Sequence, residues 1–255
     1  IQDLKKIQIT PTACQFYQEL KNVLERFGVK NVKPYDLENY DWSKVKAILM
    51  HSDPGSHYTS RPTGLTLLKR QSAPLATKYA IRSRSKIGFE YQCSSIGNFA
   101  DQWLTDVIDS VTAGHCKSFE NLKILFPSEC LVRSSPLGPG AFGTIFSKRK
   151  DWDSSKAPKK QFHDCLGQGR LEARPLHTKI LTVMDESEDK PLYYYIGSSN
   201  FTQSAWGRYI KDRQQLMVCN FELGLLLDAS DYPVPWPYKR PAPAYNTASD
   251  RPWAQ

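Results

Sequence analysis

Long apolar runs and closely spaced cysteines are both missing from this sequence of 255 residues. No stretch approaches the roughly 18 apolar residues that a membrane-spanning helix needs, so we expect no membrane partner. The six cysteines are too few for a disulfide scaffold, and no two stand at C-x-x-C spacing. We therefore expect reduced thiols in an intracellular protein, with no zinc site and no other cofactor.

Acidic residues are in the minority. The chain has 34 Lys and Arg against 26 Asp and Glu, which gives a formal charge of +8 and a pI of about 9.1. Two segments concentrate the excess: residues 64–86 carry six basic residues and no acid, and residues 148–160 carry six more. A basic balance favours polyanions such as nucleic acid or anionic membrane surfaces, although a lysine-rich soluble surface explains the charge alone equally well.

Apolar spacing and breaker residues predict an α/β domain. Helical patterns occur at 14–27, 101–111 and 203–206, and at 64–86 with an interruption at Pro74. Strand patterns occur at 45–51, 88–93, 122–126, 177–184, 192–198 and 215–227, and residues 134–143 form a loop of small residues. We expect a single domain over residues 1–255, with a Pro-rich extended tail from about 231 to 255.

The most informative residues lie between 176 and 207. His177 and Lys179 stand two apart on a predicted strand and share one face, and the next predicted strand leads into Asn200. A histidine can attack phosphorus or donate a proton to a leaving oxygen, while an ammonium and an amide can stabilise the non-bridging oxygens. This set suits phosphoryl chemistry and requires no metal.

The pattern H-x-K, then a second strand, then S-x-N resembles the phospholipase D superfamily. An Asn in place of the superfamily's usual Asp is typical of the tyrosyl-DNA phosphodiesterase family. Further segments resemble that family along most of the chain: Gln92 to Gly97, Gly197 to Phe201, Ala205 to Gly207, Phe221 to Gly224 and Asp250 to Trp253.

The resemblance implies a phospholipase D-like α/β sandwich, a mixed β-sheet flanked by helices. It implies hydrolysis of the 3′-phosphotyrosyl bond between a topoisomerase peptide and single-stranded DNA, through a phosphohistidine, in the nucleus. His177 would be general acid and then base, Lys179 and Asn200 would hold phosphate oxygens, and Glu222 would orient a second histidine. DNA would lie along four serines, Ser94, Ser95, Ser134 and Ser135.

A second H-x-K motif, which such a site requires, is lacking. The one other occurrence, His115-x-Lys117, follows a loop-like Ala-Gly and leads to no matching Asn, so we interpret it as accidental. The chain therefore resembles a C-terminal catalytic half that needs the N-terminal half of the same enzyme, and we expect it to be inactive alone. A homodimer using His177 twice is the less favoured arrangement.

Two other functions remain open. Asp185 stands six residues after Lys179, as in phospholipase-type and nuclease-type members, although an acidic segment follows it. The basic segments alone would also allow a non-catalytic nucleic-acid-binding domain.

Overall fold

The computed structural model describes residues 14–29, 37, 40–84, 86–172 and 174–254. The chain divides into two compact units, residues 1–49 and 50–255. In the first unit, helix α1 (Gln15–Arg26) places Phe16 and Tyr17 against Trp42, with ring centroids 5.8 and 6.0 Å apart. The amphipathic spacing that predicted this helix is confirmed; the single domain stays a prediction.

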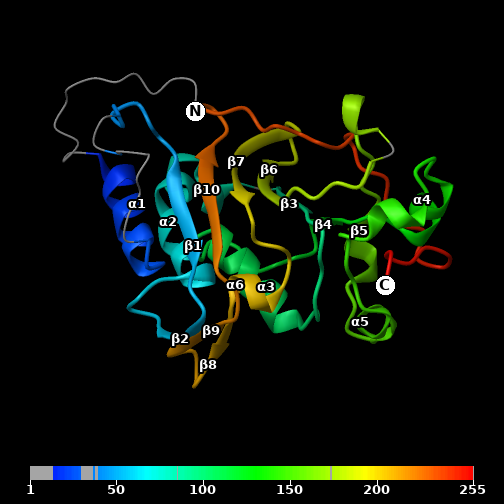
Figure 1. Cartoon of the computed structure of the whole chain (residues 1–255), viewed down its shortest axis with the longest axis horizontal. Helices are drawn as coiled ribbons and strands as arrows, with labels where there is room; N and C mark the ends of the chain where they lie inside the picture. The colour runs from blue at the N-terminus through cyan, green and yellow to red at the C-terminus, as the bar shows by residue number, and fades with distance from the viewer. Residues whose placement is uncertain (1–13, 30–36, 38–39, 85, 173, 255) are drawn as a thin grey trace. The chain divides into compact units, whose positions relative to one another are not determined.

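A seven-stranded mixed sheet, which lies in the second unit apart from the first two residues of one strand, organises that unit (Figure 1). Along the series β10, β7, β6 and β3, each strand runs antiparallel to the next, and β3, β4 and β5 are parallel. The order across the sheet is β1 (Ile48–Ser52), β10 (Glu222–Asp228), β7 (Lys190–Gly197), β6 (Ile180–Asp185), β3 (Ile87–Gln92), β4 (Leu122–Leu125) and β5 (Phe162–His163).

The central strands are covered on both faces. Every residue of β3 and of β6 is buried, as expected where layers pack on both sides of a sheet. Helices α2 and α3 pack against each other behind the sheet in the view of Figure 1. The helices of this unit are α2 (Gly64–Lys78), α3 (Asp101–Val111), α4 (Glu129–Ser134), α5 (Arg149–Asp153) and α6 (Gln203–Trp206). This layered arrangement confirms the predicted α/β fold class.

Helix α2 runs through Pro74, where we expected an interruption. Its start is fixed by a capping box, in which the Thr63 amide donates to the Thr66 hydroxyl. Pro74 costs the helix one backbone hydrogen bond, but burial of seven α2 residues against the core holds the helix together. Residues 81–83 continue it only as a short 3₁₀ turn.

Residues 215–227 form two strands in two different sheets, where the apolar pattern predicted one strand region. The first, β9 (Gln215–Val218), lies between β2 (Gly55–Tyr58) and β8 (Arg208–Ile210) in a small antiparallel sheet. The second is β10 of the large sheet. Apolar content cannot reveal this break, because both strands are largely buried.

Two further expectations are wrong in detail. The strand predicted at 177–184 begins only at Ile180, so His177 and Lys179 precede β6. The small-residue loop at 134–143 contains the last residue of α4 and a 3₁₀ turn at Pro139–Phe142.

The Pro-rich tail contains neither a helix nor a strand among its described residues, and its extended character and its start at about residue 231 stay predictions. Through residue 254 its described residues form turns and isolated bridges only. Tyr238 is fully buried with Leu125, Cys165 and Leu176, and the Arg240 guanidinium reaches the buried Glu90 carboxylate at 2.9 and 3.1 Å.

In the described part of the chain, no helix combines the length and the apolar character that crossing a membrane requires. All six cysteines are free thiols.

Candidate active site

Four chain segments meet at one edge of the large sheet. They are the end of β3, the residues before β6, the end of β7 and the start of β10, which are brought together because these neighbouring strands alternate in direction. Gln92 is opposite Ile180, Ile180 is opposite Ile196, and Gly197 is opposite Gly224. Adjacent strands are about 4.8 Å apart, so the side chains at this edge share one small region.

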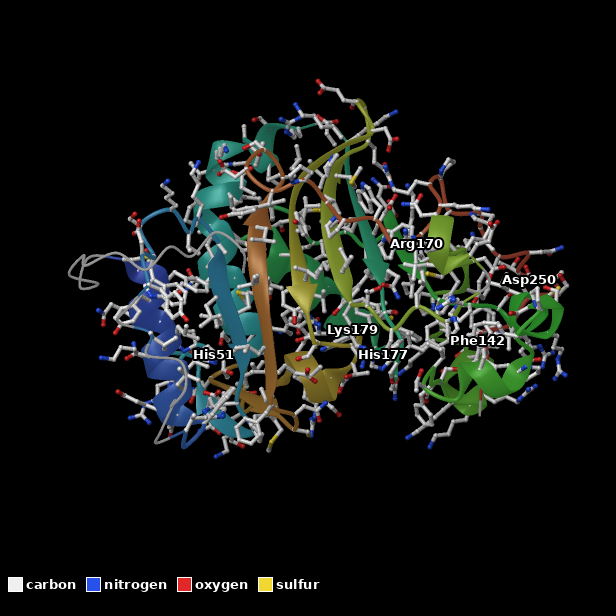
Figure 2. The ribbon with its side chains drawn as sticks, turned by 45° about the horizontal axis from the view of Figure 1, so that its top comes forward. His51, Phe142, Arg170, His177, Lys179 and Asp250 are labelled. Atoms are coloured by element: carbon white, nitrogen blue, oxygen red, sulfur yellow. The ribbon has the colours of Figure 1, made fainter. Side chains whose placement is uncertain are left out.

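His177 and Lys179 lie side by side at this edge, where β7 ends (Figure 2). The Lys179 ammonium is 3.2 and 3.4 Å from the two ring nitrogens of His177 and donates to the His177 carbonyl at 2.6 Å. Burial, and then the neighbouring ammonium, lower the pKa of His177 below its ordinary value. Burial also lowers the pKa of Lys179, although Cys93 and Glu222 act in the opposite direction. The imidazole is therefore neutral near pH 7, as a proton acceptor must be.

Gln92, the last residue of β3, holds the segment that carries His177. Its amide nitrogen donates to the Leu176 carbonyl at 3.3 Å, and its amide oxygen accepts a hydrogen bond from the Thr178 hydroxyl. Gln92 is fully buried, while His177 between these two anchor points is exposed. The clamp fixes the backbone on both sides of the imidazole, and no sequence pattern indicated it.

The two serines that follow β3 set the orientation of the Asn200 side-chain amide. Its Oδ1 accepts three hydrogen bonds, from the Ser94 amide and hydroxyl at 3.1 Å each and from the Ser95 amide at 2.9 Å. With the oxygen fully engaged, the Nδ2 amino group faces away from these donors, and it can donate to an anion. Ser94 is buried and Ser95 half-buried. Their predicted contact with DNA stays a prediction; the observed contact is with Asn200.

A belt of aromatic side chains fixes the loop before Asn200. The Tyr195 hydroxyl donates to the Ser199 hydroxyl at 2.9 Å, and the Tyr91 hydroxyl donates to the Ser199 carbonyl at 2.9 Å. Trp206 in turn donates to Tyr91 at 2.6 Å. Gly197 and Gly224 make room for the Tyr195 ring, because a Cβ on either would overlap it. The G-S-S-N and S-A-W-G segments thus act together to hold Asn200.

Glu222 is buried at the start of β10 and has partners within this chain. Its carboxylate accepts from the Ser198 hydroxyl at 2.5 Å and from the Asn220 amide at 3.0 Å. The exposed side chains of Phe221 and Leu223 flank it. Its predicted role towards a second histidine is not tested by these contacts.

An open cleft of about 550 Å³ adjoins Asn200. Ser95 lies on its wall, and two lysines of the basic segment, Lys148 and Lys150, also line it. The remaining lining residues are Ile96, Gly97, Asn98, Phe146, Asp151, Thr202, Gln203, Ser204 and Asn220.

Ser134 and Ser135, the other predicted DNA contacts, line a separate cavity of about 170 Å³, which shares no lining residue with this cleft. The structure therefore joins Ser94 and Ser95, but not Ser134 and Ser135, to the site.

Comparison with known proteins identifies the family. The family model described as tyrosyl-DNA phosphodiesterase matches residues 4–250. The chain belongs to the tyrosyl-DNA phosphodiesterase family. It is 24% identical over 226 residues to tyrosyl-DNA phosphodiesterase 1 of Drosophila melanogaster, covering 83% of this chain and 39% of that protein. It is 29% identical over 203 residues to the Arabidopsis thaliana protein of the same name, covering 74% and 32%. The chain thus spans about a third of the length of these relatives.

Solved structures share the fold. The yeast tyrosyl-DNA phosphodiesterase superposes with a TM-score of 0.74 at 18% identity, over 99% of this chain and 68% of the yeast chain. A point mutant of the yeast protein gives a TM-score of 0.76 at 17% identity, over 99% and 67%. The phospholipase D-like fold inferred from the sequence is therefore confirmed.

Asp185, which suggested other members of the superfamily, and the second H-x-K occurrence both lie away from the site. Asp185 ends β6, five residues after Ile180, so it lies about 17 Å along the strand from the His177 end. It is buried and paired with Arg84. His115 precedes β4, which runs parallel to β3, so it lies towards the opposite edge. Among the described residues no three His, Cys, Asp or Glu side chains converge to hold a metal ion.

Proposed function

We propose that this chain is the C-terminal catalytic half of a DNA-repair phosphodiesterase that hydrolyses 3′-phosphotyrosyl bonds between a topoisomerase and DNA. The observation that carries the proposal is that His177, Lys179 and Asn200 lie at the same end of adjacent strands of the large sheet. Asn200 also lines a cleft with two lysines. Family membership and the names of the relatives support this substrate. We further propose that the enzyme acts in the nucleus, where such a DNA substrate would lie.

The reaction proceeds by two displacements at phosphorus. In the first, a histidine of the N-terminal half attacks the phosphorus and the bond to the tyrosine oxygen breaks. His177 gives that oxygen a proton, which the ring holds because the bound anionic phosphate favours its protonated form over the neutral form of the substrate-free chain. In the second, the now neutral His177 takes a proton from water, the water oxygen attacks phosphorus, and the phosphorus–nitrogen bond breaks. The lowered pKa of His177 suits its second role as base.

Lys179 and Asn200 stabilise the phosphate in both steps. The ammonium and the Asn200 amino group are donors held in place before the substrate arrives, so they can neutralise charge on the non-bridging oxygens without reorganising. Glu222 reaches the N-terminal half and orients its histidine, as a carboxylate orients an imidazole in other hydrolases. The DNA strand enters along the cleft, where Ser95, Lys148 and Lys150 meet its phosphates.

The test is reconstitution with the N-terminal half. The mixture should release tyrosyl peptide from a 3′-phosphotyrosyl oligonucleotide, and the 255-residue chain alone should be slower by several orders of magnitude. Cleavage of phosphatidylcholine in place of the oligonucleotide would identify a phospholipase. Oligonucleotide binding without cleavage by the mixture would identify a non-catalytic binding domain.

A variant assigns the role of His177. With an activated leaving group, His177→Ala should slow the second step more than the first, so the covalent adduct accumulates on the N-terminal half. His115→Ala is the matched control, since that H-x-K motif lies away from the site, and it should retain full activity. Failure of His177→Ala to form any adduct would make His177 the nucleophile.

A further inference from the structure

An aromatic side chain stands exposed on the wall of the cleft, among mostly polar residues. Phe146 is 41% exposed and lines the cleft together with Asn200 and Lys148. Elsewhere the large aromatic residues of this unit pack mostly into the core. In the part of the chain that the structure describes, no other aromatic ring stacks on Phe146. A single exposed apolar residue is common on a protein surface. What sets Phe146 apart is its position in a cleft that also holds two lysines and Asn200.

The backbone of Phe146 is held in place. Its amide donates to the Ser94 carbonyl at 2.8 Å, and its carbonyl accepts from the Ile96 amide at 3.1 Å, so it pairs with the segment whose amides hold Asn200. With the backbone held, only the two side-chain torsions of Phe146 remain to be ordered when a ligand stacks on the ring. The ring therefore projects from a fixed point of the chain next to the group that we assign to the phosphate.

Buried and exposed side chains alternate around Phe146, as they do along a strand. Ile145 and Ser147 are buried, with the Ser147 hydroxyl donating to the Trp253 carbonyl at 2.7 Å, whereas Phe146 and Lys148 are exposed. Residues two apart on an extended chain share a face. The ring and the ammonium are thus presented together to the cleft.

We propose that Phe146 is a stacking platform for a nucleobase near the 3′ end of the DNA strand, with Lys148 binding the backbone phosphate beside that base. The proposal rests on the proposed function and deepens it, because it assigns a base contact to a site otherwise defined by phosphate contacts. Stacking on an aromatic ring combined with a basic groove is the physical basis of single-strand binding without sequence preference. Two lysines against one acid, Asp151, favour a polyanion over a peptide here.

The test compares Phe146 variants on oligonucleotides with and without the stacked base. Binding of the 255-residue chain to a single-stranded oligonucleotide ending in a 3′-phosphate is followed by fluorescence anisotropy. The oligonucleotide is either intact or abasic at one of its last three positions. Phe146→Ala should weaken binding of the intact strand by roughly 5- to 150-fold, the range measured for loss of one base–aromatic stack.

The decisive result is the coupling between the ring and one base. For the abasic strand that lacks the stacked base, Phe146→Ala should change the affinity by less than about twofold, because the base that would stack on the ring is already absent. Phe146→Trp should retain wild-type affinity for the intact strand. Lys148→Ala should weaken all strands alike and reduce the salt slope by about one. Circular dichroism verifies that each variant is folded.

Several outcomes would overturn the inference. Phe146→Ala could be without effect, could weaken intact and abasic strands equally, or could weaken only binding of a tyrosyl peptide, which would make the ring part of a peptide site. Failure of the proposed function has a different readout, since a reconstituted enzyme could bind the oligonucleotide through Phe146 and still leave the phosphotyrosyl bond uncut.

Discussion

At the scale of single residues, the central feature is an ammonium within hydrogen-bond reach of an imidazole. Lys179 lies 3.2 Å from His177 Nδ1, and both groups have lowered pKa values because both are partly withdrawn from water. Two adjacent positive charges would repel each other, so the pair favours a neutral ring beside a charged lysine. This is the state in which the histidine can accept a proton.

Removing the ammonium should raise the pKa of His177. Lys179→Met takes away the smaller of the two causes of the shift, so the pKa should move part of the way back towards its ordinary value of about 6.5. NMR titration of the His177 ring measures it. Lys190→Met, at the far end of the sheet, is the control and should leave the value unchanged. An unchanged or lower pKa in Lys179→Met would show that the ammonium does not act on the ring.

The lowered pKa of His177 also determines how its contribution to folding stability changes with pH. Because the pKa of His177 is lower in the folded chain than in the unfolded chain, unfolding takes up a proton in the interval between the two values. The contribution of His177 to stability is therefore complete above the unfolded value and is lost as the pH falls towards the folded value.

Asn200→Asp should separate folding from catalysis. A carboxylate can still accept the three hydrogen bonds from Ser94 and Ser95, so thermal stability should be retained. It has no amino group to offer a phosphate and adds a negative charge, so kcat of the reconstituted enzyme should fall by about 10²- to 10³-fold. Ser94→Ala removes one of the three donors and should cost much less. Equal losses for both variants would argue that Asn200 is only structural.

The chemical residues of the site are predictions from sequence, whereas the residues that support them are visible only in the structure. His177, Lys179 and Asn200 are recognisable because their types and spacing suit phosphate chemistry. The clamp from Gln92 and the cradle from Ser94 join residues 84 to 106 positions apart in the chain, and no local pattern carries such a pairing. The separation of Ser134 and Ser135 from the site was hidden for the same reason.

At the scale of elements, the glycine pair between β7 and β10 sets the geometry of the site loop. Gly197 and Gly224 face each other, and the Tyr195 ring occupies the space that their missing side chains leave. This packing lets the Tyr195 hydroxyl reach Ser199, the residue before Asn200. A substitution of Gly224 on β10 would therefore displace Tyr195 and change the loop that follows β7.

Gly224→Ala should destabilise the fold by about 1–3 kcal/mol, since the new methyl group would overlap the Tyr195 ring. Urea unfolding measures the change. Gly140→Ala is the control, because a Cβ there meets nothing within 4 Å, and its stability should stay within about 0.5 kcal/mol of wild type. A Gly224→Ala variant as stable as wild type would contradict the tight packing.

Helices and strands with a regular spacing of apolar residues were predictable from sequence, whereas those whose bounds depend on tertiary contacts were not. Helix α3 has the predicted bounds, Asp101–Val111, because its amphipathic spacing and its burial agree. Pro74 predicted a break in α2, yet packing of the helix outweighs one lost hydrogen bond. The split of 215–227 between two sheets depends on which strands lie alongside, which the sequence of that segment does not specify.

At the scale of the whole molecule, the tail is tied to the middle of the large sheet. Glu90 on β3 is 2% exposed, and its carboxylate is matched by the Arg240 guanidinium, the Tyr238 hydroxyl and, at 3.6 Å, the Lys123 ammonium. A buried carboxylate is stable only while such partners are present. The tail therefore supplies the charged and polar partners of a buried carboxylate in the sheet, in addition to covering the sheet.

Arg240→Ala should destabilise the fold by about 3–5 kcal/mol, because it leaves Glu90 buried with its main partner gone. Thermal unfolding measures the loss. Lys239→Ala, next in the chain, removes a more exposed pair with Glu172 and should cost less than about 1 kcal/mol. The double variant Glu90→Gln with Arg240→Ala should recover part of the stability. Equal effects of the two single variants would contradict this role of Arg240.

The distance along the chain between Glu90 and Arg240 sets a delay during protein synthesis. The two residues are 150 positions apart, so at about 5–20 residues per second a ribosome reaches the arginine roughly 8–30 s after the glutamate. Throughout that interval the nascent strand carries a carboxylate that cannot yet be buried with its guanidinium. All seven strands of the large sheet are synthesised before Arg240, so the Glu90–Arg240 pair can form only after them. A message truncated before the Arg240 codon would yield a chain whose sheet keeps this carboxylate without its guanidinium.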